Sequence, residues 1–317
     1  MTGIAGTPSG VAPATTGGGA TFSQPTSLSG VYEALAAGAR IVAGGTDLIV
    51  GTRQGKWKVP DHIVAVDRVA GMLGIRPTTG GGLWVGALTS HEDIANNALV
   101  RERFTALADG SAIVGSHATR NVGTIGGNVM NASPAAETVG PLICFGAVAV
   151  LASAGGERRV AVADLATGPG RTSAAAGEVL IALELPAPAA GTASCYARLE
   201  YRRQMEIAVV GATAVFTVSG GKVSGAHVAI TALSPTIRRV ADSEGILNGS
   251  DGGRDAAERA AQAAAAASRP IDDVRAPADY RRAMAAVITR RVILGAVERA
   301  HGAGPTIPAS DALHGAR

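Results

Sequence analysis

The 317-residue sequence predicts a protein of mixed helices and strands that folds as two domains. Up to about residue 186, short apolar strands bounded by glycine or proline alternate with helical patterns. A run of small residues and proline, 187–192, then marks the expected domain boundary. Beyond it, a strand pair joined by Gly220 and Gly221 is followed by three helical segments.

The elements of the first domain follow from these patterns in order. The expected elements are a helix over 27–38, a strand over 40–43, a helical turn over 46–53, strands over 62–67 and 83–88, and helices over 91–96 and 99–108. A glycine-rich loop follows. It leads to a helix over 141–145 and to strands over 147–153, 158–162 and 177–186.

The second domain is expected to begin with β structure over 195–203 and 207–219. Gly220 and Gly221 turn the chain into a further strand over 222–233, which makes a hairpin. Helical patterns cover 239–247, 254–267 and 279–300. In the last of these an apolar stripe recurs every four residues and predicts core packing; it consists of Tyr280, Met284, Ile288 and Val292.

Composition excludes several functional classes. The net charge is +3, and no Lys/Arg-rich run interleaved with aromatic residues is present, so we expect no nucleic-acid binding. Two cysteines, Cys144 and Cys195, cannot ligate an iron–sulfur cluster, and six scattered histidines predict no metal site.

Residues 1–20 lack a basic leader and an apolar run and are expected to be a disordered tail, and residues 304–317 are expected to be a loose tail. No apolar run reaches the length that spans a membrane.

Two glycine loops carry the main functional signal. AGGTD (43–47) and TIGGN (124–128) each place paired glycines beside a threonine. Backbone N–H groups at glycines can form an anion-binding concavity, and a pair of such loops could hold a pyrophosphate from both sides. Tight turns are the alternative interpretation of the same residues. Neither loop matches GxGxxG or GxxxxGK[ST], so neither a Rossmann nor a P-loop nucleotide site is predicted.

A resemblance to a known protein family extends over about residues 21–300. It is carried by the runs ARIVAGGTDL, GALTSHEDIA, RNVGTIGGNVMNASPAAE, GPGRTS, GEVLIALELP, YRRQMEIAVVGA and ALSPTIRRVADSEGIL. The chain resembles the FAD-binding subunit of molybdenum hydroxylases, the xanthine dehydrogenase family, which includes the medium subunit of aerobic carbon monoxide dehydrogenase. The resemblance implies an α+β fold. A vanillyl-alcohol-oxidase (PCMH)-type FAD-binding domain of two subdomains would cover 21–190. A C-terminal domain of the CO dehydrogenase flavoprotein type, with a small antiparallel sheet and a helix bundle, would cover 193–303.

The resemblance also implies which residues contact FAD. The first loop contributes Val42, Ala43, Gly44, Gly45, Thr46, Asp47 and Leu48. The second contributes Thr124, Ile125, Gly126, Gly127 and Asn128, with Asn121 and Gly123 leading into it. Further contacts are implied for Thr89, Glu137, Leu180 and Arg198; Glu137 stands where the family usually has the shorter Asp. His91 is expected to cap a helix, while the role of His117 stays open. A Cβ at Gly126 or Gly127 is expected to occupy space that phosphate oxygens need.

The implied function is an electron relay. Nothing in this chain could deliver substrate electrons, so no catalytic residue is assigned to it. The resemblance implies two partners, a small subunit with two [2Fe-2S] clusters and a large molybdopterin subunit, assembled as a dimer of heterotrimers. Electrons would pass through FAD to an external acceptor. The cytoplasm is the expected compartment, with association at the inner face of the membrane left open. A self-sufficient FAD oxidase of the same fold and a non-catalytic assembly subunit are the alternatives.

Overall fold

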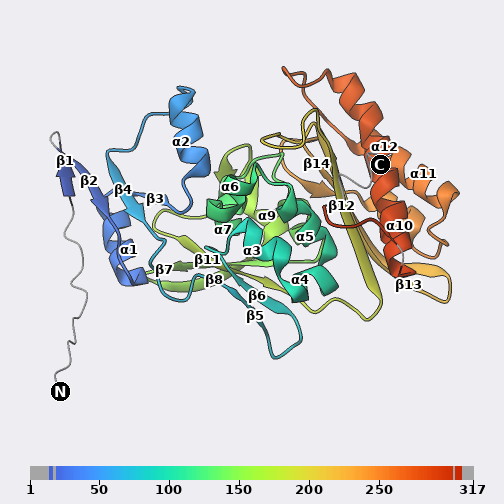
Figure 1. Ribbon diagram of the computed structural model, residues 1–317, viewed down its shortest axis with the longest axis horizontal. Coiled ribbons are helices and arrows are strands. Elements are labelled where there is room, and N and C mark those ends of the chain that lie inside the picture. Colours follow the sequence, from blue (N-terminus) through green and yellow to red (C-terminus); the bar gives the residue numbers. More distant parts are fainter. Residues whose placement is uncertain (1–13, 17–18, 303, 309–317) are drawn as a thin grey trace.

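The computed structural model describes residues 14–16, 19–302 and 304–308. Figure 1 shows an N-terminal lobe at one end, a central sheet with its helices, and a C-terminal sheet covered by helices at the other end. No helix among these residues is both long and apolar enough to cross a bilayer.

The N-terminal lobe is a four-stranded sheet in the order β1-β2-β4-β3, with two helices. Its elements are β1 (Ala14–Thr16), β2 (Ala20–Ser23), α1 (Leu28–Ala36), β3 (Arg40–Val42), α2 (Thr46–Arg53) and β4 (His62–Ala65). Helix α1 begins where the Ser27 hydroxyl accepts the Gly30 N–H. Strand β1 lies within the segment expected to be a disordered tail; residues 1–13 and 17–18 are outside the described residues.

The central sheet is antiparallel throughout, in the order β5-β6-β11-β7-β8. Its strands are β5 (Ile75–Pro77), β6 (Leu83–Gly86), β7 (Val148–Ser153), β8 (Gly156–Ala161) and β11 (Val179–Leu185). Between β6 and β7 the chain forms α3 (His91–Asn96), α4 (Ala98–Arg103), α5 (Thr105–Ala112), α6 (His117–Val122), α7 (Ile125–Met130) and α8 (Val139–Cys144). Helix α9 (Val162–Leu165) and the small pair β9 (Ala166–Gly168) and β10 (Arg171–Thr172) precede β11.

Two expectations for this region were wrong. The helix expected over 99–108 is two helices, because the chain turns at Phe104, whose buried ring packs edge-on against Phe145. The stretch 120–137, expected as an open loop, contains α6 and α7. Thr124 caps α7 by accepting the Gly127 N–H, which offsets the low helix propensity of two glycines.

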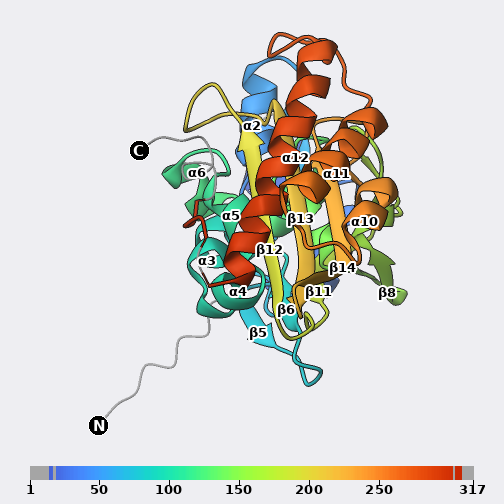
Figure 2. The same cartoon turned by 90° about the vertical axis from the view of Figure 1, so that its right-hand side faces the viewer.

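The C-terminal sheet has the order β12-β13-β14-β15, formed by β12 (Thr192–Leu199), β13 (Val210–Ser219), β14 (Lys222–Thr231) and β15 (Arg238–Arg239). The predicted hairpin is confirmed: Gly220 and Gly221 have φ of 56° and 73° in its turn, a conformation that glycine adopts without strain. Helices α10 (Ala241–Leu247), α11 (Arg254–Ala267) and α12 (Ala278–Ala300) follow. Figure 2 shows α11 and α12 lying across this sheet.

Successive side chains of β12 point to opposite faces of the C-terminal sheet, and the two faces pack against different cores. Cys195 and Ala197 are buried in the core shared with the C-terminal helices. Tyr196 belongs instead to the core of the central region, and Arg198 is fully buried two residues further along the same face. The C-terminal sheet therefore packs on both sides.

The apolar stripe predicted for the last helix is only partly correct. Ile288 and Val292 are fully buried, but Tyr280, in the first turn of α12, is 41% exposed. Part of the tail expected to be loose is packed: the Pro305 carbonyl accepts hydrogen bonds from Arg299, and Ile307 contacts the central core. Residues 309–317 are outside the described residues.

Candidate functional site

The first glycine loop joins a short parallel strand to a helix. Strand β3 ends at Val42, whose carbonyl accepts the Val66 N–H, and α2 starts four residues later. Gly45 is the N-cap of α2 and has φ of 68°, a left-handed conformation that favours glycine. The first N–H groups of a helix have no acceptor within it, so the backbone of Thr46, Asp47 and Leu48 can donate to an anion.

The two glycine loops contact each other directly. A Cβ built on Gly44 would lie 2.0 Å from the Val122 carbonyl oxygen and 3.1 Å from the Gly123 Cα. One built on Gly123 would lie 3.6 Å from Thr46 Oγ1. Gly44 is therefore required for the close approach of the two loops, and the predicted residues Gly44, Thr46 and Gly123 form one cluster.

The second loop is bonded to the segment that follows β6. Ile125 N–H donates to the Thr89 carbonyl at 3.0 Å, Gly126 N–H to the Ala87 carbonyl at 2.8 Å, and His91 N–H to the Gly123 carbonyl at 3.1 Å. Because the N–H groups of Ile125 and Gly126 are engaged by protein, they are not free donors for a phosphate. The first loop thus offers more free backbone donors than the second.

Gly126 and Gly127 have different surroundings. A Cβ on Gly126 would lie 2.6 Å from both the Cβ and the carbonyl oxygen of Ala87, so this buried glycine is explained by packing within the protein. Gly127 is exposed, and a Cβ there would meet only Thr124 Oγ1, at 3.0 Å. Of the two glycines, only Gly127 presents an open surface to a ligand. The expectation that a Cβ at either position competes with phosphate applies to Gly127 alone.

Glu137 and Arg198, assigned separately from the sequence, meet in an ion pair. Arg198 Nη1 lies 2.5 Å from Glu137 Oε1, and Arg198 Nε donates to Glu200 Oε2 at 2.6 Å. Both side chains of the Glu137–Arg198 pair are buried. Burial raises the pKa of Glu137, and the guanidinium of Arg198 opposes that shift. Glu200, two residues after Arg198, is a further member that the sequence analysis did not single out.

Other predicted contact residues have partners within the protein. Thr89 Oγ1 is bonded to both the N–H and the carbonyl of Gly74, which gives this buried hydroxyl a structural role. Asn128 accepts a hydrogen bond from Thr138 at 2.7 Å. Asn121 is exposed and donates to the His117 carbonyl within α6. Leu180 is buried in the central core, next to a register shift in β11.

The two histidines near the loops differ in environment. His91 is the first residue of α3, and the cap is Ser90, whose hydroxyl accepts the Asp93 N–H, so the expectation that His91 is the cap was wrong. Burial lowers the pKa of His91 to about 4, and the Arg120 guanidinium adds to that shift. Its ring edge lies 3.4 Å from the Gly123 Cβ position. His117 is exposed, 3.5 Å from the Glu92 carboxylate, which also pairs with Arg120.

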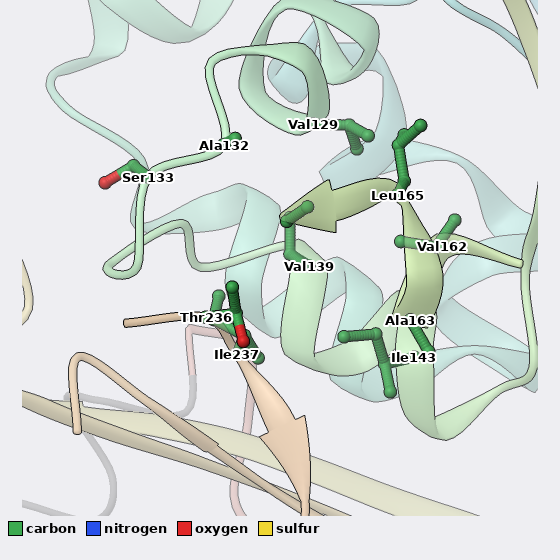
Figure 3. Close-up of a pocket in the computed structure, with 11 residues that line it drawn as sticks. Val129, Ala132, Ser133, Val139, Ile143, Val162, Ala163, Leu165, Thr236 and Ile237 are labelled. Carbon is green, nitrogen blue, oxygen red and sulfur yellow. The ribbon is translucent and has the colours of Figure 1, made fainter. Parts of the chain in front are cut away.

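A small cavity lies beyond the second loop, between α7, α8, α9 and the chain that leads into β15 (Figure 3). It encloses about 10 Å³ and is lined mainly by aliphatic side chains, among them Val129, Val139, Ile143 and Ile237. An apolar space of that size is a packing defect rather than a ligand site.

Comparison with known proteins identifies both halves of the chain. Residues 17–188 match the family model described as the FAD binding domain in molybdopterin dehydrogenase. Residues 195–296 match the model described as the CO dehydrogenase flavoprotein C-terminal domain.

Individual relatives span nearly the whole chain. The carbon monoxide dehydrogenase medium chain of Hydrogenophaga pseudoflava is 30% identical over 84% of this chain and 91% of that protein. The xanthine dehydrogenase FAD-binding subunit of Escherichia coli O157:H7 is 26% identical over 83% and 90%.

Solved structures give the same assignment. The carbon monoxide dehydrogenase from H. pseudoflava that lacks the Mo-pyranopterin moiety aligns with a TM-score of 0.84 at 30% identity, over 88% of this chain and 97% of the matched chain. Quinoline 2-oxidoreductase from Pseudomonas putida 86 aligns with a TM-score of 0.82 at 30% identity, over the same shares. The α+β fold and the FAD cofactor expected from the resemblance are thereby confirmed. The chain belongs to the family of FAD-binding medium subunits of carbon monoxide and xanthine dehydrogenases, which are oxidoreductase complexes.

Proposed function

We propose that this chain is the electron-relay subunit of a molybdopterin-containing hydroxylase or dehydrogenase. It would take electrons from the [2Fe-2S] clusters of a small partner subunit, reduced in turn by a large molybdopterin subunit, and pass them to an external acceptor. The observation that carries the proposal is the direct contact of the two glycine loops, in which Gly44 packs against Gly123 next to Thr46, at the start of α2.

The residues present fit the phosphates of FAD. Three N–H groups at the start of α2 and the Thr46 hydroxyl provide donors in the first loop, and the exposed Gly127 leaves room for close backbone approach in the second. We assign the pyrophosphate to this place. In this arrangement Gly126 and Thr89 act indirectly, by holding α7 against the segment after β6.

The Glu137–Arg198 pair is our candidate for a polar contact with FAD, at its sugar or adenine side for Glu137, and Leu180 is our candidate for an apolar contact with the flavin. A buried, charged pair costs free energy unless it is fully bonded, and its presence beside a cofactor site is often functional. FAD supplies one- and two-electron chemistry when bound; the protein contributes position and electrostatics.

No electron donor is evident among the residues that the structure describes. Both cysteines are buried, and burial raises the pKa of each thiol. Within the described ranges, no group of three His, Cys, Asp or Glu side chains is placed to hold a metal ion. We therefore favour a relay over a self-sufficient FAD oxidase or a flavin-free assembly subunit. A dimer of heterotrimers in the cytoplasm, with membrane association open, remains our hypothesis for the complex.

Acid release of the bound cofactor followed by chromatography tests the phosphate assignment. We expect FAD as the main species, because its pyrophosphate can accept from the N–H groups of the first loop while it lies against Gly127 of the second. FMN, which has a single terminal phosphate, would contradict the two-loop site, and a colourless protein after attempted reconstitution would favour the assembly subunit.

A further inference from the structure

The edge of β12 that no strand pairs with is covered by an ion pair, whose members are 190 positions apart in the sequence. Arg299, in the last turn of α12, donates to Asp109 of α5 through two bonds, Nη1 to Oδ2 at 2.6 Å and Nη2 to Oδ1 at 2.9 Å. Asp109 is fully buried, and Arg299 is nearly so. The pair thus joins the C-terminal helices to the helices beside the glycine loops.

Both members of the pair also bind the backbone of β12. Asp109 Oδ2 accepts the Tyr196 N–H at 3.0 Å, and Arg299 Nη1 donates to the Ser194 carbonyl at 2.8 Å. The Ser194 hydroxyl in turn accepts the Ala106 N–H at the start of α5. Because β12 is the edge strand of its sheet, these backbone groups have no neighbouring strand to pair with. The pair takes the place of that strand.

The next residue of β12 on the face of Tyr196 is Arg198, which pairs with Glu137. Position and tilt of β12 therefore determine where the Arg198 guanidinium lies. We propose that Asp109 and Arg299 are positioning residues of the flavin site, which fix the edge of β12 so that Arg198 meets Glu137 beside the cofactor. This inference rests on the proposed function.

The proposal is tested with the full chain by comparing three proteins. The first is Asp109→Leu with Arg299→Met, which removes both charges at similar volume, so that neither is left buried alone. The second is Arg299→Lys, which keeps the charge but cannot form two parallel bonds. The control is Glu258→Leu with Arg290→Met, which removes an ion pair of α11 and α12 that touches neither β12 nor the glycine loops.

Each protein is stripped of flavin and titrated with FAD, while circular dichroism follows folding. We expect the Kd for FAD to rise at least tenfold in the double variant and by a smaller factor in Arg299→Lys, with a changed visible flavin spectrum in both. The control should bind like the wild type. The spectrum matters because a purely structural pair would leave the environment of the bound flavin unchanged.

A folded double variant with Kd and spectrum equal to those of the wild type would overturn the proposal. Loss of fold in both the double variant and Arg299→Lys would also count against it, because the pair would then be required for folding alone. A wild-type chain that binds no FAD would instead refute the proposed function.

Discussion

Gly127 is an exposed residue of α7, and an added Cβ would meet only Thr124 Oγ1, at 3.0 Å. We expect Gly127→Val to fold but to lose FAD, because the valine would occupy the space assigned to phosphate oxygens. If the displaced phosphate loses one or two hydrogen bonds with the protein, at about 1.5–3 kcal/mol each, the affinity for FAD falls about ten- to a hundredfold per bond. Flavin absorbance per protein, measured beside circular dichroism, checks this.

The matched control for this substitution is Gly245→Val in α10. Gly245 is helical, exposed and has no heavy atom within 4 Å of its Cβ position, so it reports the cost of a valine in an open helical position away from the glycine loops. Gly220 is a poorer control because its φ of 56° would strain any valine. A Gly127→Val protein with full flavin content would refute the phosphate assignment.

His91 predicts a dependence of stability on pH. Its pKa is about 4 in the folded chain and 6.5 in the unfolded one, so between these values the unfolded state binds more protons. Stability is therefore highest above pH 6.5 and falls as the pH is lowered towards 4. The loss amounts to about 3 kcal/mol at most. Urea unfolding of wild type and His91→Gln at pH 7.5 and 5 should show a smaller difference between the two pH values for the variant; equal differences would contradict the assignment.

At the scale of elements, α12 is buried along its middle and exposed at its start. Ile288→Ala should lower the free energy of unfolding by about 2–5 kcal/mol, because Ile288 is fully buried between the C-terminal sheet and α11. Tyr280→Ala should change it by less than about 0.5 kcal/mol, since Tyr280 is 41% exposed. Chemical denaturation of both variants measures this. An equally large loss of unfolding free energy in both would mean that Tyr280 packs in the core, as the sequence pattern predicted.

Elements with a strong local signal could be predicted from the sequence, and elements defined by distant contacts could not. The hairpin at Gly220–Gly221 and helix α11 follow from turn residues and periodicity, and the structure places them where the patterns indicated. The break at Phe104 depends on a ring contact with Phe145, forty-one positions away, which no local pattern encodes. The helical form of 125–130 was missed because glycine opposes helix, while the bonds to residues 87 and 89 favour it.

The same distinction holds for the candidate site. Paired glycines with threonine indicated both loops, but not that the loops touch at Gly44, nor that Gly126 packs on Ala87. Glu137 and Arg198 were each assigned to the cofactor without any sign that they bind one another. Chemistry at a site can be inferred from residue types, whereas its geometry depends on long-range packing.

At the scale of the whole molecule, the proposed relay predicts that substrate oxidation requires a partner chain, whereas the flavin of this chain can be reduced chemically without one. The isolated, FAD-loaded chain should show no turnover with small organic substrates, whereas a chemical reductant should bleach its flavin absorbance. The reason is that both thiols are buried and that the described part of the chain shows no other electron-donor group. Anaerobic absorbance spectroscopy with and without candidate substrates decides the matter. Substrate-driven bleaching in the absence of partners would support the self-sufficient oxidase.

The order of strands in the central sheet has a consequence for how the chain acquires its fold. Strand β11 lies between β6 and β7, so Ala182 pairs with Gly86 on one side and with Val150 on the other. During synthesis β6 and β7 emerge first and have no neighbour at the position that β11 will fill. Pairing over about a hundred residues is slow, and open strand edges favour aggregation while they last. Arrival of the segment Val179–Leu185 is therefore the step that closes the sheet, and it also supplies the Ile181 carbonyl that binds the Ala87 N–H, beside the second glycine loop.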